Sequence, residues 1–205
     1  MTELTPKSLF SPVLHSANLT YTLLRSKDFA FIRDLFNSTM DAEAEDKFTI
    51  SSVRQLTINT APRSNELHGE RSKDAAIYVV RLNGEAGERI GEINLTRRNS
   101  NLPLDIGFAF LPQYRGKGYG TEAATRIMRY WKDEFGIKNI CGIVSEENIA
   151  SRKLLMRIGL EENGWAMSSG RLSLIYSLPG ASKQEGLEFS FWGEEPNEGE
   201  AIILD

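Results

Sequence analysis

The sequence LDIGFAFLPQYRGKGYGTEAATRIMRYWKDEF, residues Leu104–Phe135, combines a strand, a glycine-rich loop and a helix. Ile106–Leu111 is a short run of mostly large apolar side chains that stops at Pro112, as a buried strand does. Three glycines follow within five residues: Gly116, Gly118 and Gly120. After them, apolar residues recur every three or four positions as far as Phe135, which predicts a helix with one buried face.

A glycine loop that opens a helix favours an anionic ligand. Glycine lets the backbone approach a ligand closely, and the N–H groups of the first helical turn have no partner within the helix. The helix dipole adds positive potential at this end. Arg115 and Lys117 supply further positive charge in the same loop. We therefore expect a ligand that carries phosphate.

The spacing of the loop residues distinguishes among phosphate-binding patterns. A nucleotide-hydrolysing P-loop has Ser or Thr after its lysine, whereas Gly118 follows Lys117. Glycines at alternate positions also fail the dinucleotide pattern G-x-G-x-x-G. The segment Gln113–Gly118, QYRGKG, resembles instead the Q/R-x-x-G-x-G/A motif of the GNAT superfamily of acetyl-CoA-dependent N-acetyltransferases. The surrounding residues resemble the branch that contains the bacterial ribosomal-protein N-acetyltransferases. A glycine turn that serves packing alone is the alternative.

A second segment, Asn148–Leu160 or NIASRKLLMRIGL, resembles the GNAT signature N-x-x-S-x-x-L-x-x-K-x-G-F, with Arg157 and Leu160 as departures. Asn148 suits a helix N-cap, because its side-chain oxygen can accept an unpaired N–H. Two interpretations stay open for Asn148: capping alone, or capping together with a contact to the pantetheine or the reacting centre. The tyrosine that often protonates the leaving thiolate in this superfamily is replaced by Leu155. Ser151 or ordered water is our hypothesis for that proton donor.

The resemblance also implies which residues contact acetyl-CoA. The backbone of Phe108, Ala109, Phe110 and Leu111 would pair with the pantetheine like an added strand, at a splay between this strand and Ile137–Val144. A backbone N–H near Phe110 or Leu111 would polarise the thioester carbonyl. The pyrophosphate would lie among the following residues: Gln113, Arg115, Gly116, Lys117, Gly118, Tyr119, Gly120 and Thr121.

An amine must be neutral when it attacks a thioester, so a base or a water relay is expected. An amine with a pKa near 10.4 is neutral about once in a few thousand molecules at pH 7, and an α-amino group about once in seven. Glu92 and Asp105 are the candidate bases. The alternative for both is a charge on a solvated face or at a hairpin end. Glu122 fits the first turn of a helix better than a base.

The expected fold class is α/β (α+β), the GNAT fold: a mixed, mostly antiparallel sheet of about seven strands flanked by about four helices. We divide the chain into an N-terminal extension at 1–18, the acetyltransferase domain at 19–178 and an acidic tail at 179–205. Ser26 or Asp28 is expected to cap the first helix. The expected strands are Leu19–Leu24, Ala76–Leu82, Ile90–Thr96, Ile106–Leu111, Ile137–Val144, Leu160–Asn163 and Leu172–Leu178, with one more at Gly186–Trp192. The expected helices are Phe29–Phe36 and Ala44–Ile58, which would line the acceptor site, and two that follow the motifs; Ala61–Asp74 is expected to be a loop.

Composition limits the class of protein. The 205 residues carry a net charge of −4, and the segment from Leu178 onward holds seven acids against Lys183 alone. The rest lacks the basic excess of a nucleic-acid binder, so no nucleic-acid partner is expected. No apolar run approaches the roughly 20 residues of a membrane span, and the start lacks a signal peptide, so we expect a cytoplasmic, intracellular protein with no membrane partner. The lone Cys141 reads as a core residue, and two histidines give no metal spacing, so no metal is expected.

These features predict an N-acetyltransferase that moves the acetyl group of acetyl-CoA, the co-substrate, to a primary amine by direct attack in a ternary complex. A protein or peptide N-terminus is the first acceptor class, and a small amine is the second. The alternative is a non-catalytic GNAT-like protein that binds acyl-CoA, which the missing tyrosine at Leu155 favours. The sequence leaves a monomer and a homodimer equally open.

Overall fold

The computed structural model describes residues 10–40, 47–60, 63–64, 75–96, 98, 101–189 and 200–201. The strands are β1 Val13–His15, β2 Leu19–Leu23, β3 Arg63–Ser64, β4 Ala75–Leu82, β5 Arg89–Thr96, β6 Leu104–Phe110, β7 Ile140–Ser145, β8 Glu161–Ser168, β9 Arg171–Ser177, β10 Gln184–Phe189 and β11 Glu200–Ala201. The helices are α1 Phe29–Asn37, α2 Ile50–Thr60, α3 Tyr119–Phe135 and α4 Ile149–Arg157, with short 3-10 turns η1 Ser26–Asp28 and η2 Pro112–Tyr114.

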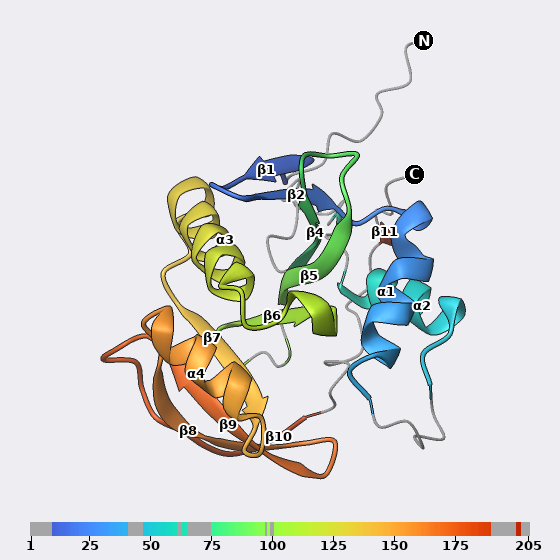
Figure 1. Ribbon diagram of the computed structural model, residues 1–205. Helices are drawn as coiled ribbons and strands as arrows, with labels where there is room; N and C mark the ends of the chain where they lie inside the picture. The colour runs from blue at the N-terminus through green and yellow to red at the C-terminus, as the bar shows by residue number, and fades with distance from the viewer. Residues whose placement is uncertain are drawn as a thin grey trace.

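Nine strands form one sheet in the order β1-β2-β4-β5-β6-β7-β9-β8-β10 (Figure 1). Neighbouring strands run antiparallel, except that β6 is parallel to β7 and β8 is parallel to β10. The expected fold class is confirmed. The sheet is wider than the seven strands expected, because β1 and β10 extend its two edges.

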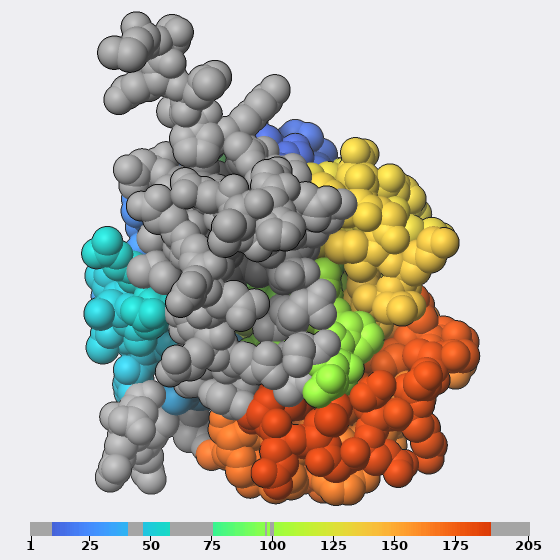
Figure 2. All heavy atoms as spheres, turned by 180° about the vertical axis from the view of Figure 1, so that it is seen from behind, coloured from blue at the N-terminus to red at the C-terminus, as the bar shows by residue number. Residues whose placement is uncertain are grey.

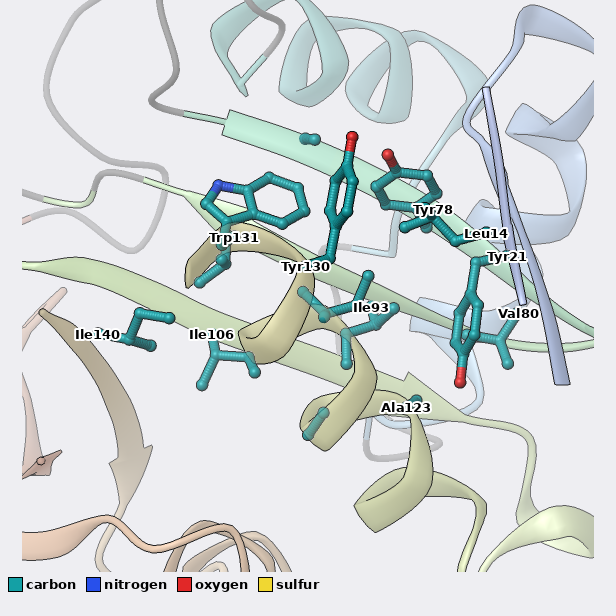
Figure 3. Packing of buried hydrophobic residues seen from close by; sticks show 14 of the residues in the cluster. Leu14, Tyr21, Tyr78, Val80, Ile93, Ile106, Ala123, Tyr130, Trp131 and Ile140 are labelled. Atoms are coloured by element: carbon teal, nitrogen blue, oxygen red, sulfur yellow. The ribbon is translucent and has the colours of Figure 1, made fainter. Parts of the chain in front are cut away.

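Helices cover both faces of the sheet. Side chains alternate between the faces of a strand, so Tyr78 and Val80 of β4 point to α3, whereas Ile77 and Val79 pack with α1 and α2. Figure 3 shows Tyr130 and Trp131 of α3 beside Tyr78 in the larger core. The amphipathic pattern of α3 therefore reflects direct burial on the sheet.

Several element boundaries differ from the sequence-based expectation. Helix α2 begins at Ile50, where Thr49 caps it by accepting the Ser52 N–H at 3.1 Å. Residues 41–46, in which the predicted helix was expected to begin, lie outside the described part. Strand β8 continues to Ser168, five residues beyond the expected end, because a turn with positive φ at Ser169 and Gly170 carries its ladder into β9.

Asp28 does not cap α1 as expected. Its buried carboxylate accepts hydrogen bonds from Arg81 at 2.9 Å and Arg89 at 2.8 Å, and no cap bond from its side chain to α1 forms. A buried carboxylate needs such charged partners. The pairs fix the start of α1 against the β4–β5 hairpin, beside the end of β6.

Both ends of the chain contribute strands. Val13–His15, within the expected extension, pair with β2, and the aromatic ring of Phe10 is buried against Trp131. The strand predicted in the acidic tail is present as β10, which pairs in parallel with β8 and forms the edge of the sheet. The predicted residues after Phe189 and most of the predicted loop at 61–74 lie outside the described residues, although β3 pairs there with β11.

Candidate functional site

The parallel strands β6 and β7 pair over only two positions. Leu104 is opposite Ile140 and Asp105 is opposite Cys141. Beyond them, the Ile143 N–H donates to the Asp105 Oδ1 at 2.9 Å. The Asp105 carboxylate thus accepts the N–H that would bond a backbone carbonyl of β6 if the ladder continued. The two strands separate from this point, as expected from the resemblance.

The separation leaves specific backbone groups of β6 without a neighbouring strand. In an antiparallel ladder, successive residues turn their N–H and C=O to opposite sides. The Leu111 N–H donates to the Ile90 oxygen at 3.0 Å, which places Leu111 and Ala109 toward β5. Phe108 and Phe110 therefore face the separated side. This corrects the expectation that Ala109 and Leu111 offer backbone groups to a ligand.

The loop after β6 is open at two glycines. Gly116 and Gly118 have φ of 73° and 85°, and a Cβ added at either would meet no atom within 4 Å. Glu122 donates the first helical N–H of α3, to the Gly118 oxygen at 3.0 Å. The N–H groups of Tyr119, Gly120 and Thr121 come before that bond and have no acceptor within the helix. The loop therefore fits a phosphate group.

Side chains also shape this loop. Arg115 donates its Nε to the Phe110 oxygen at 2.8 Å, which ties the loop to the end of β6. The Lys117 ammonium lies 5.3 Å from the centre of the Tyr114 ring, and Gln113 is exposed. Gly120 differs from the other two glycines, because a Cβ there would approach the Leu154 Cδ1 to 2.7 Å. Gly120 thus allows α3 to lie close to α4.

The start of α4 confirms the cap at Asn148. The Asn148 Oδ1 accepts the Ser151 N–H at 3.1 Å. Leu155 is buried with its side chain on Gly142 of β7, where it leaves no room for a Cβ. Ser151 lies one turn before Leu155 on the same side of the helix, and it is half-buried. The Ser151 hydroxyl thus lies on the same side of α4 as Leu155.

Arg152 holds the β7–α4 loop. It donates to the Tyr176 hydroxyl at 3.0 Å and to the Glu146 oxygen at 3.1 Å. No motif in the sequence marks this residue, because its side-chain partner Tyr176 lies on the distant strand β9.

The two candidate bases are buried, which excludes the alternative of a solvated face. Glu92 and Asp105 are each 2% exposed. Burial raises the pKa of Glu92 to about 7, although the Asn94 Nδ2 donates to its Oε2 at 2.9 Å. Burial also raises the pKa of Asp105, an effect that its ion pair with Arg98 at 2.9 Å opposes.

Glu92 and Asp105 differ in their hydrogen-bond partners and in their position in the sheet. Both oxygens of Asp105 are engaged, one by Arg98 and one by Ile143. Glu92 lies beside Ala109, on the sheet face that α1 and α2 cover. Glu122, in contrast, bonds Ser16 and Asn18 in the β1–β2 turn and is remote from this face.

Two further features of the described residues concern metal binding and membranes. Within the described ranges, no three His, Cys, Asp or Glu side chains are grouped so that they would hold a metal ion. None of the described helices is both long and apolar enough to cross a membrane. Cys141 is fully buried, as expected of a core residue.

The chain is similar to known acetyltransferases. Residues 18–161 match the family model for the acetyltransferase (GNAT) domain. The uncharacterized N-acetyltransferase YnaD of Bacillus subtilis is 29% identical over 104 residues, 45% of this chain and 61% of that protein, which is less than two thirds of its length.

Two solved structures share the fold. One from Vibrio cholerae, described as a ribosomal-protein-serine acetyltransferase, has a TM-score of 0.62 and 17% identity, covering 82% of this chain and 99% of its own. A chimera of the Vibrio cholerae spermidine N-acetyltransferase SpeG with hSSAT has a TM-score of 0.60 and 19% identity, covering 79% of this chain and 95% of its own. The family model spans more than half of the sequence. The chain therefore belongs to the acetyltransferase (GNAT) domain family.

Proposed function

We propose that this chain transfers the acetyl group of acetyl-CoA to a primary amine. One observation carries the proposal: the side of β6 that presents the Phe108 backbone and the Phe110 N–H has no neighbouring strand and leads directly into the open glycine loop. An extended amide chain that ends in a pyrophosphate matches both parts, the first as an added strand and the second at the helix N-terminus. Bound there, acetyl-CoA supplies an activated acetyl thioester.

The residues around the splay then take separate roles. Glu92 accepts a proton from the amine, directly or through water, since a base with a pKa near the working pH is effective. The Phe110 N–H faces the separated side and is the donor for the thioester oxygen. Ser151 is the proton donor to the thiolate. Asp105 keeps β6 and β7 apart, because Arg98 and Ile143 occupy its oxygens.

A peptide or protein N-terminus is the acceptor class that we favour. Its α-amino group is neutral about once in seven molecules at pH 7, so one weak base such as Glu92 suffices. The structural similarity to a protein described as a ribosomal-protein-serine acetyltransferase points the same way. The similarity to a spermidine N-acetyltransferase supports a small amine as the second class.

A second function is a protein that binds acyl-CoA without turning it over. Leu155 supports it, because its buried alkyl side chain cannot protonate a thiolate. Release of free thiol from acetyl-CoA, measured with a serine-terminated peptide and with spermidine, distinguishes the functions. We expect turnover with a higher kcat/KM for the peptide. Thermal stabilisation by acetyl-CoA without thiol release from any amine would favour the binder.

Gly118→Ala tests the place of the co-substrate. Acetyl-CoA at about 100 times Kd should raise the Tm of the parent protein by about 5 to 11 °C. The added methyl occupies open space in the loop, so this rise should be lost in the variant. Gly136→Ala is the matched control, since Gly136 has a φ of 66° and equally open surroundings at the other end of α3.

Both glycine variants should lose about 1 kcal/mol of stability from the left-handed backbone. The difference between them therefore lies in ligand binding alone. An equal rise of Tm in the two variants would place acetyl-CoA elsewhere.

Glu92→Gln tests the base. With a peptide acceptor, the variant should lose about 100- to 10,000-fold in kcat/KM. In the parent protein, kcat/KM should rise with pH through the Glu92 pKa of about 7, and the variant should lack that rise. Unchanged kinetics in the variant would remove Glu92 from the reaction.

The same substitution gives an independent readout in stability. Between about pH 4.5 and 7, folded Glu92 holds a proton that the unfolded chain has released, so the free energy of unfolding falls as the pH rises through this range. The fall amounts to about 3 kcal/mol for a pKa raised to about 7. Urea unfolding at pH 5 and pH 8 measures the free energy of unfolding of both proteins. This fall should appear in the parent protein and be absent from Glu92→Gln. A constant difference between the two proteins would mean that the pKa is not raised.

A further inference from the structure

A column of polar side chains runs along β5 beneath α1 and α2. Glu92, Asn94 and Thr96 are alternate residues and share one face of the strand. They lie opposite Ala109, Gly107 and Asp105 of β6. The column is flanked by two apolar clusters, one from α1, α2 and β4 and one from β7, β8 and β9. Figure 2 shows α2 in cyan on one side of the molecule and the C-terminal strands in orange and red on the other.

The side chain of Asn94 lies over Gly107. A Cβ built on Gly107 would be 2.6 Å from the Asn94 Oδ1 and 2.7 Å from its Nδ2. The amide therefore extends from β5 across β6, toward the side on which β6 separates from β7. Glycine at position 107 is what makes room for it.

Glu92 sets the orientation of this amide. The Asn94 Nδ2 donates to the Glu92 Oε2 at 2.9 Å. When Glu92 is ionised, as a base must be, it only accepts hydrogen bonds, so Asn94 then presents its NH2 group to Glu92 and turns its oxygen away. The Asn94 Oδ1 is buried and has no partner among the described residues. Such an acceptor is costly and is rarely left unsatisfied in a native protein.

Asn94 and Thr96 both carry an unsatisfied oxygen in this column, but the pairing of the strands beside them differs. The Thr96 Oγ1 is also buried without a partner. Thr96 lies beside Asp105, however, at the last position where β6 still pairs with β7. Asn94 lies beside Gly107, the next residue on that face and beyond the last pair. Asn94 thus lies beside the part of β6 that has separated from β7, and Thr96 lies beside the part that is still paired.

We propose that the Asn94 Oδ1 accepts a hydrogen bond from the nitrogen of the acceptor substrate and makes the site selective for primary amines. The inference rests on the proposed acetyl transfer and deepens it. A neutral primary amine has two N–H groups, one for Asn94 and one for Glu92. A hydroxyl group or a neutral secondary amine has one donor and leaves one of the two oxygens unsatisfied. The pair therefore selects N-acetylation of a primary amine.

The test compares Asn94→Leu with Thr96→Val. Both substitutions remove a buried unsatisfied oxygen with little change of size. Asn94→Leu should lower kcat/KM for a primary amine about 10- to 100-fold, the value of one hydrogen bond to a reacting group. Its KM for acetyl-CoA should stay within about twofold of the parent value. Thr96→Val should leave both quantities unchanged.

Selectivity between a primary amine and its N-methyl analogue distinguishes contact with the substrate from a merely structural role of Asn94. The parent protein should prefer a primary amine to its N-methyl analogue, and Asn94→Leu should reduce this preference by the same factor of about 10 to 100. Gly107→Ala is the second variant, because its methyl would displace an intact Asn94, and it should reproduce the loss. Thermal unfolding with acetyl-CoA confirms that each variant is folded.

Two results would overturn the proposal. Equal acceptor kinetics and equal selectivity in Asn94→Leu and Thr96→Val would show that Asn94 does not contact the amine, while acetyl transfer would stand. Absence of thiol release by the parent protein with every amine would remove acetyl transfer itself, and the role of Asn94 with it.

Discussion

The site depends on the place where β6 stops pairing with β7. Asp105 bonds the Ile143 N–H, so β7 has one fewer donor to offer to the backbone of β6. The ion pair with Arg98 holds this carboxylate in place. From there Phe108 and Phe110 have no strand beside them on one side, where Arg115 bonds the Phe110 oxygen, and β6 leads into the glycine loop. Of the two candidate bases, we propose that Asp105 serves to keep the two strands apart.

We propose that the face of β5 and β6 beneath α1 and α2 carries the acceptor chemistry. Burial of Glu92 between apolar clusters raises its pKa to about 7, which favours a base at neutral pH. Asn94 bonds Glu92 and lies over Gly107 of β6. A side chain at position 107 would collide with the Asn94 amide. In the proposed reaction, the co-substrate lies on one side of β6, and the base lies on β5 at its other side.

The sequence predicted the elements that depend on residues close together in the chain. The glycine loop, the helix after it and the Asn148 cap follow from residues adjacent in sequence, and each is confirmed. Burial of Glu92 and Asp105 depends on strands that are remote in sequence, so the residues alone left a solvated face open. Asp28 was expected to cap α1 for its side-chain type, but Arg81 and Arg89 offer stronger, charged partners. Asn94 carries no motif, and only the register of β5 against β6 reveals it.

Backbone amide hydrogen exchange, followed by NMR with and without saturating acetyl-CoA, tests the central claim most directly. Phe108 and Phe110 turn their N–H groups to the separated side, whereas the Leu111 N–H is already bonded to Ile90. Exchange at Phe108 and Phe110 should slow when acetyl-CoA binds, with Leu111 unchanged as the internal reference. If acetyl-CoA binds and leaves exchange at both phenylalanines unaltered, the co-substrate does not pair with β6, and the account of the site is contradicted.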